Sequence, residues 1–168
     1  INGQIIQREG TTNIHPKWHP SKNGFAYLSN KSNDYFGQTS LYYFDLEKKK
    51  EEKIKSNVYS APSWHSNGEV IFYSKKAKFP NKYGSRYYDI YYYNFITEKE
   101  ERLTTDLRAF NPVFIEKDSL IAFISTSDGG QDLFIFNLKT NESQKVTNFE
   151  NRPMISHLNY DSKEHALY

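Results

Sequence analysis

The side chains of this sequence with the greatest capacity for chemistry are its five histidines, at positions 15, 19, 65, 157 and 165. His15 and His19 are four residues apart, a spacing that puts them on one face of a strand but about 13 Å apart, too far to share one metal ion. The sequence contains no Cys, Gly-x-Ser-x-Gly elbow, phosphate loop, His-Glu-x-x-His or calcium-loop pattern. We therefore assign no catalytic residue, no metal ligand and no cofactor.

A second candidate site is the segment 75–88, which carries five positive charges and no acidic residue. Aromatic rings alternate with these cations, and such a surface can stack on sugars or bind an acidic peptide. The alternative is a solvated insertion without a ligand. A second loop, 30–39, is expected to place Tyr35 on the opposite side of the ligand-binding surface from segment 75–88. The ligand-binding candidates in the basic segment are Lys75, Lys78, Lys82, Tyr83 and Arg86.

The candidate residues lie within a sequence repeat. A proline, an aromatic residue two positions later and a second aromatic nine residues further on recur three times, with the aromatic pairs at 18 and 27, 64 and 73, and 114 and 123. A fourth copy begins near Pro153, where Asn159 replaces the first aromatic residue. Each complete copy continues with a second apolar run, a polar turn and a charged strand. Four strands in about 46 residues predict an all-β fold, a β-propeller of four-stranded antiparallel blades.

The repeat divides the chain into blades. We expect one partial propeller domain over residues 1–168, with complete blades at about 12–57, 58–106 and 107–149, a partial blade at 150–168, and residues 1–11 as the outer strand of a preceding blade. Propellers usually have four to eight blades, which predicts that this chain is part of a longer propeller. If the polypeptide ends here, open sheet edges predict self-association. Asn-Gly pairs at 23–24 and 67–68 predict tight turns with positive φ.

The loops between second and third strands and the connections between blades lie on one face of a propeller. On this face we place Arg108 and Arg152, which recur at similar repeat positions and could form a guanidinium pair that binds a carboxylate. The alternative is that both are solvated. His15 and His157 are further ligand-binding candidates near the channel, whereas His19 and the equivalent His65 are interpreted as structural, with a chelating cluster as their alternative.

Composition and charge argue against nucleic-acid binding and against membrane insertion. The 22 Lys and Arg residues nearly balance the 20 Asp and Glu residues, so no overall field favours nucleic acid. The longest apolar run, Leu120 to Ile124, is too short for a membrane helix, so we expect no membrane insertion. The N-terminal residues show neither a Met nor a signal-peptide pattern.

The order of proline, aromatic residue, polar turn with glycine, apolar strand, Asp-apolar-aromatic and closing Leu-Thr resembles the WD-like propeller repeat of the TolB family, over essentially residues 12–168. The turn Asp-Gly of that repeat is Asn-Gly at 23–24 and 67–68. Similar repeats occur in periplasmic TolB-like proteins, in propellers of prolyl-oligopeptidase-type peptidases, in tricorn-like proteins and in some oligogalacturonate lyases. The resemblance implies a bacterial protein that is periplasmic or secreted.

These observations predict a non-enzymatic TolB-like scaffold that binds a protein, peptide or cell-envelope polymer on its loop face. The ligand is expected to be acidic or a carbohydrate. The alternative is the propeller part of a serine peptidase or of an oligogalacturonate-lyase-like enzyme. A purely structural assembly module is the third interpretation.

Overall fold

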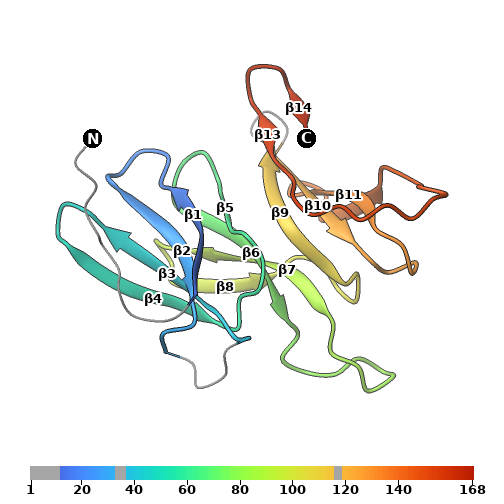
Figure 1. Ribbon diagram of the computed structural model, residues 1–168, viewed down its shortest axis with the longest axis horizontal. Coiled ribbons are helices and arrows are strands. Elements are labelled where there is room, and N and C mark those ends of the chain that lie inside the picture. Colours follow the sequence, from blue (N-terminus) through green and yellow to red (C-terminus); the bar gives the residue numbers. More distant parts are fainter. Residues whose placement is uncertain (1–11, 33–36, 116–118) are drawn as a thin grey trace.

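The computed structural model describes residues 12–32, 37–115 and 119–168, and every regular element in these ranges is a strand (Figure 1). These ranges accordingly contain no helix that could cross a membrane. The strands are β1 (Asn13–Trp18), β2 (Gly24–Ser29), β3 (Ser40–Asp45), β4 (Lys50–Ser56), β5 (Ser63–Trp64), β6 (Val70–Lys76), β7 (Tyr88–Asn94), β8 (Lys99–Arg102), β9 (Ala109–Ile115), β10 (Leu120–Ser125), β11 (Asp132–Asn137), β12 (Glu142–Lys145), β13 (Tyr160–Asp161) and β14 (Ala166–Leu167).

The strands form separate antiparallel sheets in chain order. Blades 1, 2 and 3 are the four-stranded sheets β1–β4, β5–β8 and β9–β12, and a two-stranded sheet, β13–β14, begins blade 4. Figure 1 shows the sheets arranged one after another along the molecule. The predicted all-β propeller of four-stranded blades is confirmed. The outer strand predicted at 1–11 lies outside the described residues.

The third and fourth strands of each complete blade are joined by the same turn chemistry. A side-chain oxygen at the end of the third strand accepts two backbone N–H groups of the turn, and a left-handed residue follows. The acceptors are Asp45, Asn94 and Asn137. The left-handed residues are Lys49, Glu98 and Asn141. These local hydrogen bonds explain why the polar turns of the sequence repeat in register.

The apolar core lies between neighbouring blades. One buried cluster joins Ala26, Leu28 and Leu41 of blade 1 to Trp64 and Tyr73 of blade 2. A second cluster joins blade 2 to blade 3, where β9 packs against β6 and β7. Because the central strands of blade 2 have a cluster on each face, they are apolar along almost their whole length.

The two tryptophans show how much burial depends on the neighbouring blade. Trp64 is 9 % exposed between blades 1 and 2, whereas Trp18, at the same position of the repeat, is 68 % exposed. Side chains alternate along β2, so Phe25, which contacts Trp18, faces away from Ala26 and the cluster shared with blade 2. The repeat predicts equivalent aromatics at both positions, and their surroundings differ because only Trp64 lies between two described blades.

His19 and His65 connect blades. The Nδ1 atom of His19 accepts backbone N–H groups of its own turn, while Nε2 lies 2.9 Å from the carbonyl oxygen of Gly68 in blade 2. The His19 ring is 4.7 Å from that of Trp64, and the His65 ring is 4.2 Å from that of Phe114 in blade 3. Both histidines therefore have structural roles at successive blade contacts.

The two Asn-Gly turns differ. Gly68 has a φ of +73°, as predicted, but Gly24 does not have a positive φ and is the first residue of β2. The prediction for 23–24 was wrong because glycine is needed there for space instead: a Cβ on Gly24 would lie 2.4 Å from the Tyr43 hydroxyl and 2.7 Å from the Phe44 carbonyl oxygen.

Gly68→Ala is expected to destabilise the protein more than Gly129→Ala. Both glycines have a positive φ, for which any Cβ costs about 1 kcal/mol. A Cβ at Gly68 would also lie 2.3 Å from Cε1 of His19, whereas nothing lies within 4 Å at Gly129. Urea unfolding of the two variants measures the difference, and equal losses of unfolding free energy would show that His19 does not restrain this turn.

Candidate functional site

The loop face of the molecule is defined by the strand order. Because the strands of each blade are antiparallel, the β2–β3 and β6–β7 loops and the connections between blades leave the same end of the sheets. The β1–β2 and β3–β4 turns lie at the other end. The basic segment 75–88 and the inter-blade residues Arg108 and Arg152 are thus brought to the same end of the sheets.

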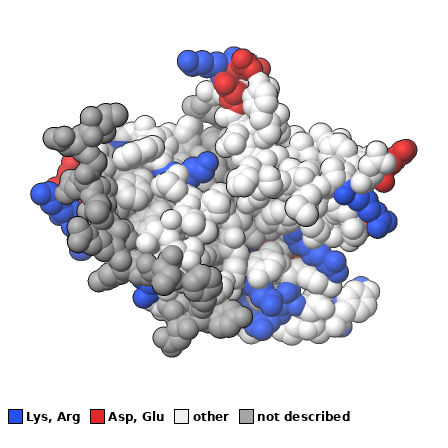
Figure 2. Space-filling model, in the orientation of Figure 1, with Lys and Arg blue, Asp and Glu red and all other residues white. Residues whose placement is uncertain are grey.

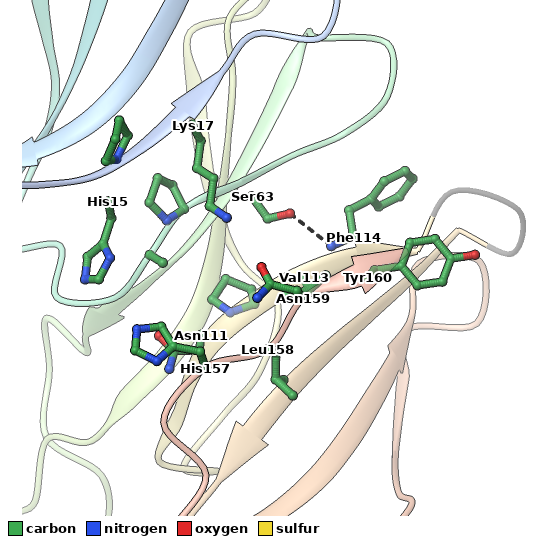
Figure 3. Close-up of a pocket in the computed structure, with 14 residues that line it drawn as sticks. His15, Lys17, Ser63, Asn111, Val113, Phe114, His157, Leu158, Asn159 and Tyr160 are labelled. Atoms are coloured by element: carbon green, nitrogen blue, oxygen red, sulfur yellow. Dashed lines mark hydrogen bonds between the residues drawn. The ribbon is translucent and has the colours of Figure 1, made fainter. Parts of the chain in front are cut away.

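The first strands of blades 1 to 3 (β1, β5 and β9) and the segment 157–160, which leads into β13, surround a central hollow of about 450 Å³. Side chains from all four blades line it (Figure 3). These residues are His15, Pro16, Lys17, Ala61, Pro62, Ser63, Asn111, Pro112, Val113, Phe114, His157, Leu158, Asn159 and Tyr160. The Phe114 backbone N–H donates to Ser63 Oγ at 3.0 Å, which holds β9 beside β5. The hollow therefore occupies the channel position of a propeller.

Bulges in the first strands direct side chains toward this channel. In β1 the pair His15 and Pro16 interrupts the register with β2, and in β9 the pair Asn111 and Pro112 interrupts the register with β10. His15 and Asn111 are both left-handed, with φ of 55° and 51°. Proline has no N–H to donate to a ladder and is tolerated at a bulge, so two His/Asn-Pro pairs encode the same local bend.

Two predicted binding residues meet in the channel. The rings of His15 and His157 are 6.4 Å apart between centroids and inclined at 61°. Burial lowers the pKa of His15, and the nearby His157 and Lys17 lower it further. Asn111 donates from Nδ2 to the Ser156 carbonyl oxygen at 2.9 Å and so fixes the segment that carries His157.

A mouth hollow of about 500 Å³ adjoins the central one and shares His15, Asn111 and His157 with it. Tyr59 and Tyr88 form its outer wall, with ring centroids 5.1 Å apart in an edge-to-face arrangement. The mouth hollow therefore connects the histidines of the channel to the aromatic rings of blade 2.

A basic hollow of about 450 Å³ continues outward from the same two tyrosines. It is lined by Gln38, Asn57, Tyr59, Lys75, Lys76, Ala77, Lys78, Arg86 and Tyr88. Figure 2 shows Lys and Arg side chains gathered over the loop that joins β6 to β7. The mouth hollow and the basic hollow together form a groove with an aromatic centre and a cationic end, which we call the loop-face groove.

The predicted residues of the basic segment have different environments. Lys75 lines the basic hollow, but its ammonium group is bound by Glu100 at 2.9 Å. Lys78 and Arg86 line the same hollow. Lys82 lies over the ring of the exposed Tyr83, at 4.9 Å from its centroid, and neither residue lines the hollow.

Arg108 and Arg152 each pack against a loop of the preceding blade. The guanidinium of Arg108 stacks 4.3 Å from the Tyr87 ring centroid and donates to the Tyr87 hydroxyl at 3.0 Å. Arg152 packs over Gly130 in the β10–β11 turn, with its Cγ 3.3 Å from the position of a glycine Cβ. The two side chains thus have different partners, and the proposed carboxylate-binding pair stays a prediction. Tyr35 lies outside the described residues.

Sequence reasoning did not identify Lys17 as a channel residue. Lys17 immediately precedes the repeat aromatic Trp18, at a position where the repeat keeps no residue type: Ser63 and Val113 are its equivalents. The available signal was its place on a first strand, because first strands line the axis of a propeller. Within the described residues, no group of three or more His, Cys, Asp or Glu side chains is arranged to hold a metal ion.

Comparison with known proteins adds independent information. No protein-family model matches the chain. The Tol-Pal system protein TolB of Ruthia magnifica subsp. Calyptogena magnifica is 34 % identical over 107 residues, which covers 62 % of this chain and 23 % of that relative. The chain thus spans about a quarter of the length of the curated relative it matches.

Solved structures agree in fold. TolB from Acinetobacter baumannii superposes with a TM-score of 0.66 and 19 % identity, covering 83 % of this chain and 33 % of that one. The β-propeller domain of the Trilobed protease from Pyrococcus furiosus superposes with a TM-score of 0.61 and 14 % identity, covering 82 % of this chain and 43 % of that one. At these identities the likeness shows the propeller fold alone.

Proposed function

Because this chain is a TolB-like β-propeller, we propose that it is a binding scaffold whose protein or peptide partner lies along the loop-face groove. The observation that carries the proposal is the continuity of the groove. Tyr59 and Tyr88 belong to both of its hollows, so an extended chain can contact the channel mouth and the basic loop together.

The groove supports an acidic segment as the part of the partner that binds. Aromatic rings at its centre offer an apolar contact, while Lys76, Lys78 and Arg86 offer cations at one end. The chain as a whole has a formal charge of only +2, so this concentration of positive charge is local. Local complementarity of this kind increases association rates and selects against basic partners.

The matched TolB is named as a protein of the Tol-Pal system, which supports a protein partner that belongs to a system of that type. A periplasmic location for this chain is part of the same proposal. The shared fold is a rigid scaffold of packed blades, and its binding residues lie on loops that this scaffold positions.

Reversal of charge at Lys78, Lys82 and Arg86 to Glu is expected to weaken binding of a short fluorescein-labelled Glu-rich peptide by about tenfold or more, because charge-assisted contacts of roughly 1.5–3 kcal/mol are replaced by repulsion. Fluorescence anisotropy at low and high salt measures the effect. Lys78 and Arg86 act from the hollow itself, and Lys82 acts from the neighbouring tip.

The matched control reverses three exposed lysines on turns at the opposite end of the sheets, Lys22, Lys139 and Lys163. This variant has the same net charge as the first, so unequal affinities isolate the groove from the overall field. Equal affinities of the two variants would remove the basic loop from the binding surface.

A further inference from the structure

The central hollow is lined by basic side chains. Lys17 extends from β1 into the hollow, and His15 and His157 line the same space (Figure 3). Among the described residues Lys17 forms no ion pair, and no Asp or Glu lines the central or the mouth hollow. An ammonium group without a counter-charge favours an anion beside it.

A buried hydroxyl group also lacks a partner at this place. Ser60 is 5 % exposed and lines the mouth hollow, and its Oγ has no hydrogen-bond partner among the described residues. A buried polar group left without a partner costs free energy, which a bound acceptor would recover. The mouth and central hollows share His15 and His157, so this hydroxyl and the three basic groups border connected space.

We propose that a small carboxylate binds where the central and mouth hollows meet, with Lys17, His15 and His157 as basic donors and Ser60 as a hydroxyl donor. Hydrogen bonds from charged donors to a carboxylate are the strong class of such contacts. The central hollow, at about 450 Å³, has the size of a small-molecule site. The carboxylate site shares the mouth hollow with the loop-face groove, but none of its four donors lines the basic hollow.

The affinity is expected to increase as the pH falls. The titratable groups around His15 are Lys17 on its own strand, His157 before β13, and Tyr59 and Tyr88 of blade 2. Burial, His157 and Lys17 lower the pKa of His15, and a bound carboxylate opposes the effect of these positive groups. Ligand binding then draws a proton onto the imidazole, and affinity rises by up to about tenfold per pH unit for each proton taken up.

Calorimetric titration of the chain with succinate at pH 6 and pH 8 tests this site, with neutral succinamide as the ligand control. We expect succinate to bind more tightly at pH 6, succinamide not to bind, and Lys17→Met to weaken succinate binding by about tenfold or more. Lys139→Met, an exposed lysine on the β11–β12 turn, is the matched control and is expected to bind as the wild type does.

A second measurement does not depend on the stability of the Lys17 variant. Imidazole resonances of His15 and His157, assigned through His→Gln variants, are expected to change in chemical shift on succinate addition, and the pKa of His15 is expected to rise. Unchanged resonances, equal affinity in the Lys17 and Lys139 variants, or binding of Zn²⁺ in place of succinate would each overturn the proposal.

Two sources of a carboxylate are distinguished by the loop variant. If the site takes a free small molecule, the variant reversed at Lys78, Lys82 and Arg86 still binds succinate with wild-type affinity. If the carboxylate belongs to a peptide that needs the groove, only the Glu-rich peptide shifts the two histidine resonances, and the free-ligand site is refuted.

Discussion

Asp89→Ala is expected to lower the free energy of unfolding by about 3 kcal/mol or more. Asp89 is fully buried, and its carboxylate accepts from Arg102 Nη2 at 2.6 Å and from Thr104 Oγ1 at 2.9 Å. It also accepts the backbone N–H groups of Asp106 and Leu107, each at 3.1 Å. Loss of the carboxylate leaves these donors without an acceptor, although the partly exposed Arg102 can donate to water instead. Urea unfolding followed by circular dichroism measures the loss.

The control for this variant is Asp128→Ala. Asp128 is exposed, and its one ion-pair partner among the described residues is Lys145, which also contacts Asp132. Its removal is therefore expected to change the unfolding midpoint little. Asp89→Asn keeps an acceptor oxygen and is expected to fall between the two. Equal midpoints for Asp89→Ala and Asp128→Ala would mean that the buried carboxylate does not hold β7 to the connection between blades 2 and 3.

Trp64→Ala is expected to lower the free energy of unfolding by about 3–5 kcal/mol, because it empties the centre of the contact between blades 1 and 2. The indole ring lies 4.7 Å from His19 and 5.3 Å from Phe95 between centroids. Its Nε1 also donates to the Lys17 carbonyl oxygen at 3.1 Å. Differential scanning calorimetry is the measurement, and a split transition would show that the blades had lost their coupling.

Trp18→Ala is the matched control at the same position of the repeat. Trp18 is largely exposed and contacts Phe25 in its own blade, so its loss is expected to cost much less than that of Trp64. The chain has two tryptophans, and Trp18→Phe therefore leaves Trp64 as the single indole fluorophore, with emission expected to be blue-shifted in the folded state. Similar stability losses at 18 and 64 would contradict the assigned burial.

The buried aspartates show what a repeat can and cannot predict. Asp89 and Asp132 stand at the same position of the sequence pattern, and both accept a threonine hydroxyl from beyond the fourth strand. The Lys145 side chain also lowers the pKa of Asp132, as expected for a paired carboxylate. The repeat identified the aspartate position but not its hydrogen-bond partners. These partners lie 13 to 18 residues later in the sequence and contact the aspartate only when the fourth strand pairs with the third.

The candidate site was predicted in part. The basic segment, His15 and His157 were recognised from residue type and repeat position, and the structure brings the two histidines together in the channel. The binding of Lys75 by Glu100 could not be predicted, since it depends on the register of β6 and β8 around β7. The separate partners of Arg108 and Arg152 depend in the same way on how each loop lies beside the next blade.

The sequence by itself determined the strands, the turns between third and fourth strands and the all-β repeat, because these follow from short apolar runs bounded by polar turn residues and from short-range hydrogen bonds of Asp and Asn. The tertiary structure alone decided which of two equivalent tryptophans is buried, why Gly24 has no room for a side chain, and that Lys17 enters the channel with no counter-charge among the described residues. Burial and charge balance depend on which surfaces contact each other across blades, and the sequence pattern does not specify these contacts.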